Sequence, residues 1–306
     1  MLREHSMRRF SYPLVLKIAA AVVPFALVVL AMALVLPAVK GCRERQVLGE
    51  GYVFAEAGRI RIAVPREAGE PLAKAVASDF EKFTTALYKE YGEPLGLRPV
   101  RDTITIRVFA SHADLVKFAA REMRQDASHV GGFYDPASWS IALTLLPPRD
   151  LLLMLFHEAT HLVMDRSAEA GEPQWSVWLS EGLAVYFEQT SVQGGRLRLG
   201  GASRRDARLV LAYAARRAHV PLRTLVRGGR ELFRGPLGSL CYREAGLLVA
   251  FLLDGAGGRH RQAFFRYCDL ERRPGPCPPT ALEQYLGTSL DALENDWLAY
   301  LQGIAQ

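Results

Sequence analysis

The sequence predicts an α+β fold, because strand patterns concentrate in its first half and helical patterns in its second. Nearly all runs rich in β-branched residues end before residue 145, and amphipathic helical periodicity dominates the rest. The two patterns do not alternate strictly, which argues against a doubly wound parallel sheet. Half of the 306 residues are hydrophobic, so the chain has enough apolar side chains for a large core.

The first fifty residues predict a membrane anchor. Residues 1–17 are polar and basic and are expected to be a cytoplasmic N-terminus. The next twenty-two residues, 18–39, carry no charge. As a helix they would extend roughly 33 Å, enough for a hydrocarbon core of about 30 Å. The run exceeds the apolar core of a cleavable signal peptide, so we interpret it as an uncleaved transmembrane signal-anchor. Residues 40–50 would be a tether, placing a domain at 51–306 outside the cytoplasm.

The expected strands and helices of the domain begin with a hairpin. Two β-type runs within 52–64 are separated by Gly58. A helix is expected from Pro71 to Tyr91, with proline in its first turn. The segment 103–109 alternates like a half-buried strand, and Ser111 is suited to cap a short helix after it.

The stretch GGFYDPASWSIAL predicts a turn at Asp135-Pro136 and then a strand from Trp139 to Thr144. Pro147-Pro148 precedes a long apolar helix. The expected domain therefore has an α+β half at 51–165 and a helical half at 166–306. Further helical patterns lie near 204–218, 240–254, 259–268, 278–286 and 290–303.

The most specific motif is H-E-x-x-H, formed by His157, Glu158 and His161. On a helix, positions i and i+4 lie on one face, so both imidazoles can point at one metal ion. Glu158, beside the first histidine, can reach a water on that ion. The helix is apolar nearly all round, and these polar groups need partners if it is buried. An ordinary core histidine explains two histidines on one face poorly.

A second apolar helix, WLSEGLAVYFE, is expected to supply the third metal ligand. Its only charges are Glu181 and Glu188, two turns apart on nearly the same side. Glu181 is the preferred ligand and would complete a His₂Glu zinc site with one open position. Glu188 is then either a hydrogen-bond partner of a ligand or a solvated residue. Asp165, one turn beyond His161, either supports a histidine or is a polar residue that ends its helix.

These residues resemble a known family. His157-Glu158-x-x-His161, followed by Ser180-Glu181-Gly182-Leu183-Ala184, is similar to the gluzincin branch of zinc metallopeptidases. That branch contains thermolysin and the aminopeptidases, and the chain is particularly similar to their peptidase-MA-like relatives. The resemblance covers about residues 105–255. It implies a zincin-like domain, one Zn²⁺ per chain, and peptide hydrolysis with Glu158 as general base.

A further segment, Leu240-Cys241-Tyr242-Arg243-Glu244-Ala245-Gly246, is similar to the tyrosine-bearing helix of gluzincin aminopeptidases. There the hydroxyl binds the oxyanion of the tetrahedral intermediate, which implies this role for Tyr242. The alternative is a tyrosine that opens a core helix. The family also has an active-site edge strand, and this implies that the strand Trp139–Thr144 adds the substrate backbone to the sheet.

Two departures from the family bear on activity. Val185 stands where thermolysin-like members have a buttressing aspartate, and no G-A-M-E-N-type segment is present. An endopeptidase is therefore expected. The alternative hypothesis is an inactive, zinc-stabilised, membrane-tethered scaffold. Zinc-dependent hydrolysis of a non-peptide bond is a third.

Charge and cysteine content limit the partners. The formal charge of +6 is modest, and no basic block with interleaved aromatics is present, so no nucleic-acid partner is expected. The expected partners are a peptide or protein substrate and the bilayer. Cys268 and Cys277 either form a disulfide or stay free, and Cys241 is expected to be a buried thiol. Cys42 resembles a lipoprotein acceptor, but Lys40 replaces the small residue expected before it.

Overall fold

The computed structural model describes residues 47–167, 175–194, 196–273 and 275–306. The chain divides into two compact units, Met1–Tyr52 and Val53–Gln306, and the fold described below belongs to the second. The predicted N-terminus, membrane span and Cys42 lie outside the described residues. Within those ranges, no helix has the length and apolar character needed to cross a bilayer.

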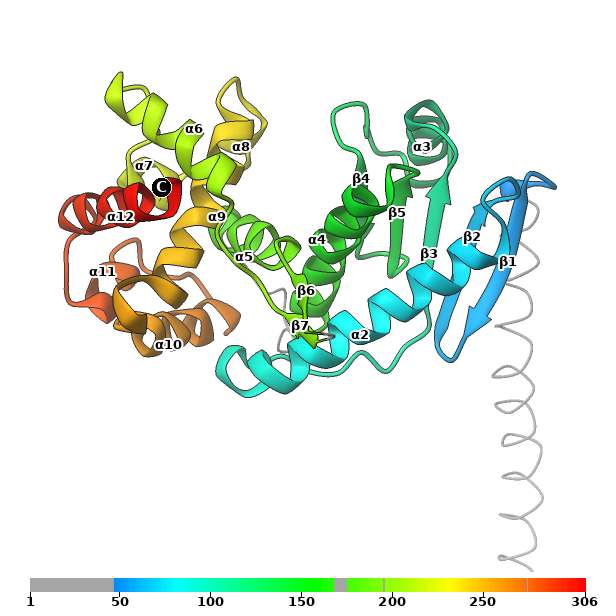
Figure 1. Cartoon of the computed structure of the whole chain (residues 1–306), viewed down its shortest axis with the longest axis horizontal. Helices are drawn as coiled ribbons and strands as arrows, with labels where there is room; N and C mark the ends of the chain where they lie inside the picture. Colours follow the sequence, from blue (N-terminus) through cyan, green and yellow to red (C-terminus); the bar gives the residue numbers. More distant parts are fainter. Residues whose placement is uncertain (1–46, 168–174, 195, 274) are drawn as a thin grey trace, which may run out of the picture. The chain divides into compact units, whose positions relative to one another are not determined.

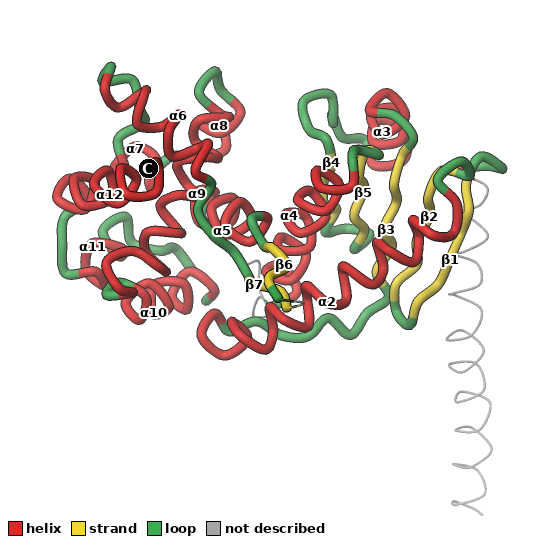
Figure 2. The backbone as a smooth tube through the Cα atoms, in the orientation of Figure 1, coloured by secondary structure: helices red, strands yellow, loops and turns green. Residues whose placement is uncertain are grey.

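Five strands form one mixed sheet in the order β1-β2-β3-β5-β4 (Figures 1 and 2). They are β1 (Tyr52–Ala57), β2 (Ile60–Pro65), β3 (Ile104–Phe109), β4 (Gly132–Asp135) and β5 (Ser140–Thr144). β3 is parallel to both β2 and β5, whereas β4 is antiparallel to β5. β1 and β2 are neighbours joined by two residues, which is the predicted hairpin. The strands precede the helical half, so the α+β prediction is confirmed.

The edge strand β4 was not predicted. Its sequence, GFYD, contains glycine and aspartate, which are depleted in strands, so the local pattern is weak. Pairing with β5 determines its conformation, from Gly132 opposite Leu143 to Asp135 opposite Ser140. A Cβ at Gly132 would lie 2.7 Å from the sulfur of Met154. The edge strand therefore lies directly against the helix that carries the H-E-x-x-H motif.

The helices of the first half are α2 (Gly69–Leu95), α3 (His112–Phe118), the π-helix η1 (Ala119–Met123) and α4 (Pro148–Arg166). The long helix α2 connects β2 to β3 and extends past both predicted ends. Phe83 on α2 stacks on Phe156 of α4, with ring centroids 4.3 Å apart. Ser111 caps α3 as predicted, because its hydroxyl accepts the backbone N–H of Asp114.

In its described residues the second half contains helices and one small hairpin, β6 (Ser191–Gln193) and β7 (Arg196–Arg198). Its helices are α5 (Val177–Glu188), α6 (Arg204–Ala215), α7 (Leu222–Arg227), α8 (Arg230–Arg234), α9 (Gly238–Asp254), η2 (Gly255–Gly258), α10 (Arg261–Arg272), α11 (Ala281–Leu286) and α12 (Leu290–Ala305). The five later helices predicted from periodicity are present with shifted ends. The short helices α7 and α8 were missed, because proline and glycine flank them and neither contains two full turns.

Helices α5 and α9 pack closely because each has a glycine at their contact. A Cβ at Gly182 on α5 would lie 2.8 Å from the backbone oxygen of Ala245 on α9. A Cβ at Gly246 would collide with the side chain of Val185. Val185, where the family resemblance would place an aspartate, thus fills a helix contact. The same contact holds the helix of Glu181 against the helix of Tyr242.

Candidate metal centre

Helix α4 carries both histidines of the motif in the middle of the domain. Pro148 occupies its first turn, where the missing N–H costs no hydrogen bond. Most of the helix is buried, as its apolar sequence predicts. The side chains of His157 and His161 nevertheless stay 15% and 18% exposed. They therefore line a place that a small ion and solvent can reach.

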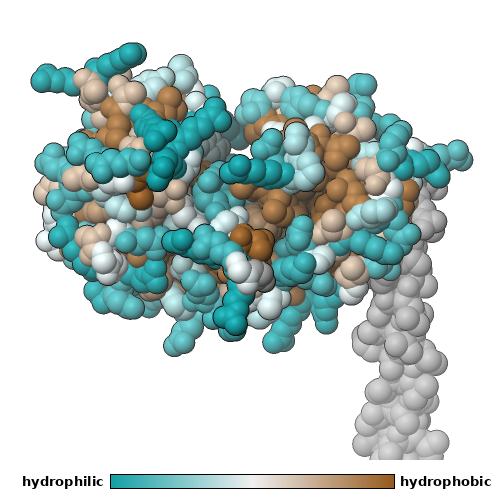
Figure 3. All heavy atoms as spheres, in the orientation of Figure 1, coloured by the Kyte–Doolittle hydropathy of each residue, from teal (hydrophilic) through white to brown (hydrophobic). Residues whose placement is uncertain are grey.

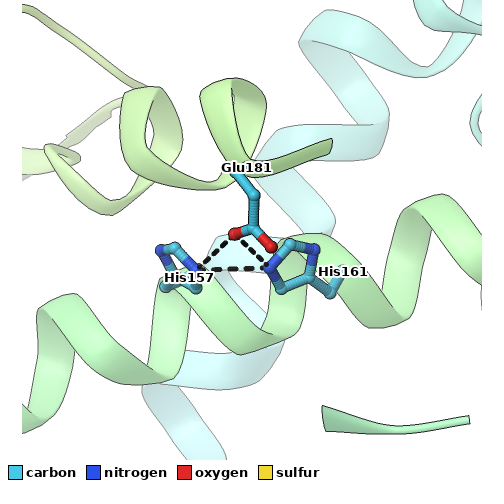
Figure 4. A group of neighbouring side chains, drawn as sticks. All are labelled: His157, His161 and Glu181. Atoms are coloured by element: carbon cyan, nitrogen blue, oxygen red, sulfur yellow. Dashed lines mark hydrogen bonds and ion pairs between the residues drawn. The ribbon is translucent and has the colours of Figure 1, made fainter. Parts of the chain in front are cut away.

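Glu181 on α5 points at the two imidazoles (Figure 4). The Nε2 atoms of His157 and His161 are 3.2 Å apart. Oε2 of Glu181 lies 3.5 Å from the first nitrogen and 3.3 Å from the second. Zinc binds nitrogen and oxygen at roughly 2.0–2.2 Å, so two ligand atoms of a tetrahedral site are about 3.3–3.5 Å apart. The three separations match the edges of one face of such a tetrahedron.

The donor set also fits a zinc ion chemically. Two imidazoles and one carboxylate form the His₂Glu set of catalytic zinc sites. Among the described residues, these three are the sole group of three or more histidine, cysteine or acidic side chains spaced to hold a metal. The predicted ligands His157, His161 and Glu181 are therefore brought together from two helices.

Mutual charge interactions are strong at this site. Burial alone would lower the pKa of His157, but hydrogen bonds to Glu181 and Glu188 raise it well above its ordinary value. Burial would raise the pKa of Glu181, yet the two histidines lower it below its usual range. The carboxylate is thus ionised at neutral pH, as a metal ligand must be.

The other ring nitrogen of each histidine is held by a side chain of α5. Nδ1 of His157 lies 2.9 Å from Oε2 of Glu188. Nδ1 of His161 lies 3.2 Å from the hydroxyl of Ser180. Such contacts fix the ring orientation and direct Nε2 toward a metal. Of the two alternatives for Glu188, the structure therefore shows the first: Glu188 is a hydrogen-bond partner of the candidate ligand His157. The role of Ser180 was not predicted, because a serine beside a ligand carries no distinctive pattern.

Asp165 does not support a histidine. Its Oδ2 accepts the hydroxyl of Tyr134 at 2.8 Å. Of the two alternatives left open for Asp165, support of a histidine is wrong, because its side chain instead binds Tyr134 of the edge strand. This hydrogen bond fastens β4 to α4, the helix that carries the H-E-x-x-H motif.

Substituting Glu188 by glutamine is expected to weaken zinc binding roughly 10- to 100-fold, because the negative charge behind His157 is removed. Competition with a chromophoric chelator measures the dissociation constant. Asp165→Asn on α4 is the control and should bind zinc like the parent chain, since Asp165 contacts Tyr134 and no histidine. Equal zinc affinities for Glu188→Gln and the parent chain would contradict the assigned role.

Glu158 is 7% exposed and lies beside the site on α4. Burial raises the pKa of its carboxyl, and the nearby histidines oppose that shift. The backbone N–H of Tyr134 donates a hydrogen bond to Glu158. The edge strand thus contacts the predicted base directly.

Tyr242 on α9 also faces the site. Burial, followed by the charges of Glu181 and Glu158 and a hydrogen bond with Glu181, raises the pKa of its phenol. The hydroxyl therefore lies near the candidate ligand and the predicted base, and it remains protonated at neutral pH. The phenol can then donate a hydrogen bond to an anion beside Glu181.

The cysteines take no part in this site. Cys268 and Cys277 are both free thiols, so the disulfide that their spacing left open is not formed. Cys241 is buried, as predicted. Burial raises the pKa of Cys277 to about 11, so it is a thiol and not a thiolate at neutral pH.

Comparison with known proteins assigns no family: the chain matches no family model and no curated protein sequence.

Proposed function

We propose that the chain is a zinc-dependent peptidase of the gluzincin type, with a zincin-like domain. The observation that carries the proposal is the spacing of the three candidate ligand atoms, 3.2, 3.3 and 3.5 Å apart, with a buried carboxylate beside them. When bound by His157, His161 and Glu181, zinc would supply Lewis-acid polarisation of a carbonyl and of a water molecule.

Glu158 is the proposed general base. Its carboxylate accepts a proton from the attacking water and passes it to the leaving amine nitrogen. Burial raises its pKa, which makes the protonated acid easier to form for the second transfer. The hydrogen bond from the Tyr134 backbone holds the carboxylate in one orientation through both steps.

The outer edge of β4, the last strand of the sheet order, is the proposed place for the substrate backbone. The prediction that the strand at Trp139–Thr144 takes this role is wrong, because β5 is paired on both sides, by β3 and β4. Within the described residues β4 has no strand partner on its outer side, and it contacts Glu158, so a peptide could add there as a further strand. Hydrophobic side chains gather over the sheet and α4 in the space-filling view (Figure 3). Leu152 and Met154 on α4, and Leu145 directly after β5, are partly buried hydrophobic residues.

Tyr242 is the proposed donor to the oxyanion that develops from the substrate carbonyl. Replacing it by phenylalanine should lower kcat roughly 10²- to 10³-fold, because one preorganised donor is lost. Steady-state kinetics measures this, and the zinc content should stay the same. Tyr213→Phe, which alters a tyrosine 39% exposed on α6, is the matched control. An unchanged kcat in Tyr242→Phe would exclude Tyr242 as an oxyanion donor, and the alternative of a tyrosine that only opens a core helix would hold.

A peptide library tests the activity itself. The full-length chain, purified in detergent, is incubated with the library with and without a zinc chelator, and products are identified by mass spectrometry. We expect internal cleavage that chelation stops and added zinc restores. A folded, zinc-loaded chain inert toward every peptide would favour the scaffold hypothesis. The buried Glu158 argues against that hypothesis, because a purely structural zinc ion needs no adjacent base.

The proposal also places the protein at a membrane. An apolar run at 18–39 would anchor the domain at a membrane, with residues 51–306 on the extracytoplasmic side and a peptide or protein as substrate. No nucleic-acid partner is proposed.

A further inference from the structure

Positive charge is concentrated in one segment of the helical half. Residues 189–243 contain twelve arginines, no lysine and only two acidic side chains, Asp206 and Glu231. The other residues contain 26 basic and 30 acidic side chains, so the rest of the chain is slightly acidic. The modest net charge therefore conceals a strongly basic segment, which forms the hairpin β6–β7, the helices α6, α7 and α8, and the start of α9.

Helix α6 presents arginines on one exposed face at the outer end of the helical half (Figure 1). The exposed side chains recur three or four positions apart, which is the spacing of a single helix face. We call this set the outer face of α6: Arg205, Arg208, Leu209, Ala212, Tyr213 and Arg216. The opposite face packs inward through Ala207 and Val210. The acidic residue of the helix, Asp206, is buried and pairs with Arg243 on α9, so it does not neutralise the outer face.

The arginines of the outer face are available to a partner. In the part of the chain that the structure describes, neither Arg205 nor Arg216 forms a salt bridge. Arg208 donates through Nε to the backbone oxygen of Ala305 at 2.9 Å, and that contact leaves its positive charge without a carboxylate. Like charges on one face raise the local positive potential, which attracts an anionic surface or ligand.

Exposed apolar side chains coincide with this charge. Among the described residues, the large hydrophobic side chains that are exposed all lie in the basic segment: Val192, Leu209, Tyr213 and Leu237. Two of them, Leu209 and Tyr213, are one turn apart on the outer face and are each 39% exposed. Single exposed hydrophobic residues need no explanation, but here a leucine and a tyrosine lie between arginines. Tyrosine favours the membrane–water interface, and arginine binds anionic lipid headgroups.

We propose that the outer face of α6 docks on the surface of a membrane that contains anionic lipids. The arginines bind headgroup phosphates through charge-assisted hydrogen bonds, and Leu209 and Tyr213 enter the interfacial layer between the headgroups. A nucleic acid or an acidic protein would match the charge, but a lipid surface also accommodates the exposed leucine. The apolar run at 18–39, interpreted as a membrane anchor, would keep the domain close to such a surface.

Docking at α6 would also orient the candidate metal centre. Asp206 on α6 pairs with Arg243 on α9, and Tyr242 directly precedes Arg243. Helix α9 in turn packs closely on α5, which carries Glu181. The outer face and the candidate ligands therefore belong to one packed group of helices, and a membrane contact at α6 would hold the site at a fixed angle to the bilayer.

Binding to added vesicles tests this proposal without requiring turnover. The full-length chain is kept in solution by a non-ionic amphipathic polymer, which covers its apolar run. It is mixed with vesicles of phosphatidylcholine alone, or of equal parts of phosphatidylcholine and phosphatidylglycerol, and flotation measures the bound fraction. We expect binding to the mixed vesicles only, and weaker binding as salt is added, because salt screens the charges.

Two variants separate the charged from the apolar contribution. Arg205→Gln combined with Arg216→Gln should lower the affinity about 25-fold, since each basic residue near an anionic surface contributes roughly fivefold. Leu209→Ser keeps the charge and should lower the affinity roughly fivefold, because less apolar surface leaves water. All three side chains are exposed, so the thermal midpoints should match that of the parent chain. The salt dependence of the parent chain is a test that needs no variant.

Arg101→Gln combined with Arg266→Gln is the matched control, because it removes two positive charges at exposed positions outside the basic segment. It should bind the vesicles like the parent chain. An equal loss in this control would overturn the proposal, since the effect would then come from the overall charge. Equal binding to both kinds of vesicle, or unchanged affinity without the two outer-face arginines, would also overturn it. Binding of a short DNA duplex through these arginines, with no binding to vesicles, would assign the face to nucleic acid instead. Zinc and peptide hydrolysis play no part in these measurements, so this proposal and the proposed function fail separately.

Discussion

Replacing Glu158 by glutamine is expected to abolish peptide hydrolysis while zinc stays bound. Glutamine has nearly the volume of glutamate, and its carbonyl oxygen can still accept the backbone N–H of Tyr134. It cannot accept a proton from water at neutral pH. Loss of general acid–base catalysis lowers rates roughly 10²- to 10⁴-fold, so kcat should fall by that factor. The thermal midpoint should not decrease, because burial already disfavours the charged form of Glu158.

Two measurements on one preparation decide this prediction. Zinc is counted by atomic emission, and hydrolysis is followed with a peptide found in the library. Glu90→Gln, an exposed position on α2, controls for the chemical change and should retain both zinc and activity. Unchanged hydrolysis in Glu158→Gln would exclude Glu158 as the base. If Glu158→Gln lost zinc as well as activity, Glu158 would be needed for metal binding. That result would contradict its proposed role as a base that does not bind the metal.

The local part of this site could be predicted from the sequence because helical spacing is local information. His157 and His161 are four residues apart, and an apolar helix of known periodicity brings them to one face. The choice of Glu181 as a candidate ligand needed a longer step, but one of only two charged residues in an apolar helix, near its start, is itself a strong signal. The α+β class could also be predicted from local information, because strand-type patterns lie mainly in the first half of the chain and helical periodicity in the second.

The rest depends on contacts between segments distant in the sequence. No local pattern distinguishes Asp165 bound to Tyr134 from Asp165 bound to a histidine, since the outcome depends on where β4 lies. Likewise β5 has the sequence of a good strand, and only the sheet order reveals that both its edges are occupied. The position of Tyr242 depends on the approach of α5 to α9, which Gly182 permits through its contact with Ala245.

Replacing Glu181 by glutamine should cause the largest loss of zinc affinity among the α5 variants. The amide is a far weaker zinc ligand than a carboxylate, and the two histidines alone leave the site one ligand short. Zinc sites in proteins bind with a free energy on the order of 10–16 kcal/mol. If this carboxylate supplies about a quarter of that energy, affinity falls by a factor of about a hundred or more. Activity should be lost at ordinary zinc concentrations.

Glu188→Gln is the matched comparison, because it makes the same chemical change seven residues later on the same helix. Zinc that binds only the folded chain raises the thermal midpoint in proportion to the logarithm of its concentration over the dissociation constant. The zinc-induced shift should therefore be large for the parent chain, reduced for Glu188→Gln and nearly absent for Glu181→Gln. The reverse order of the two variants would make Glu188 the ligand. Equal zinc-induced shifts in all three chains would show that zinc binds elsewhere, and the proposed function would fail with the site.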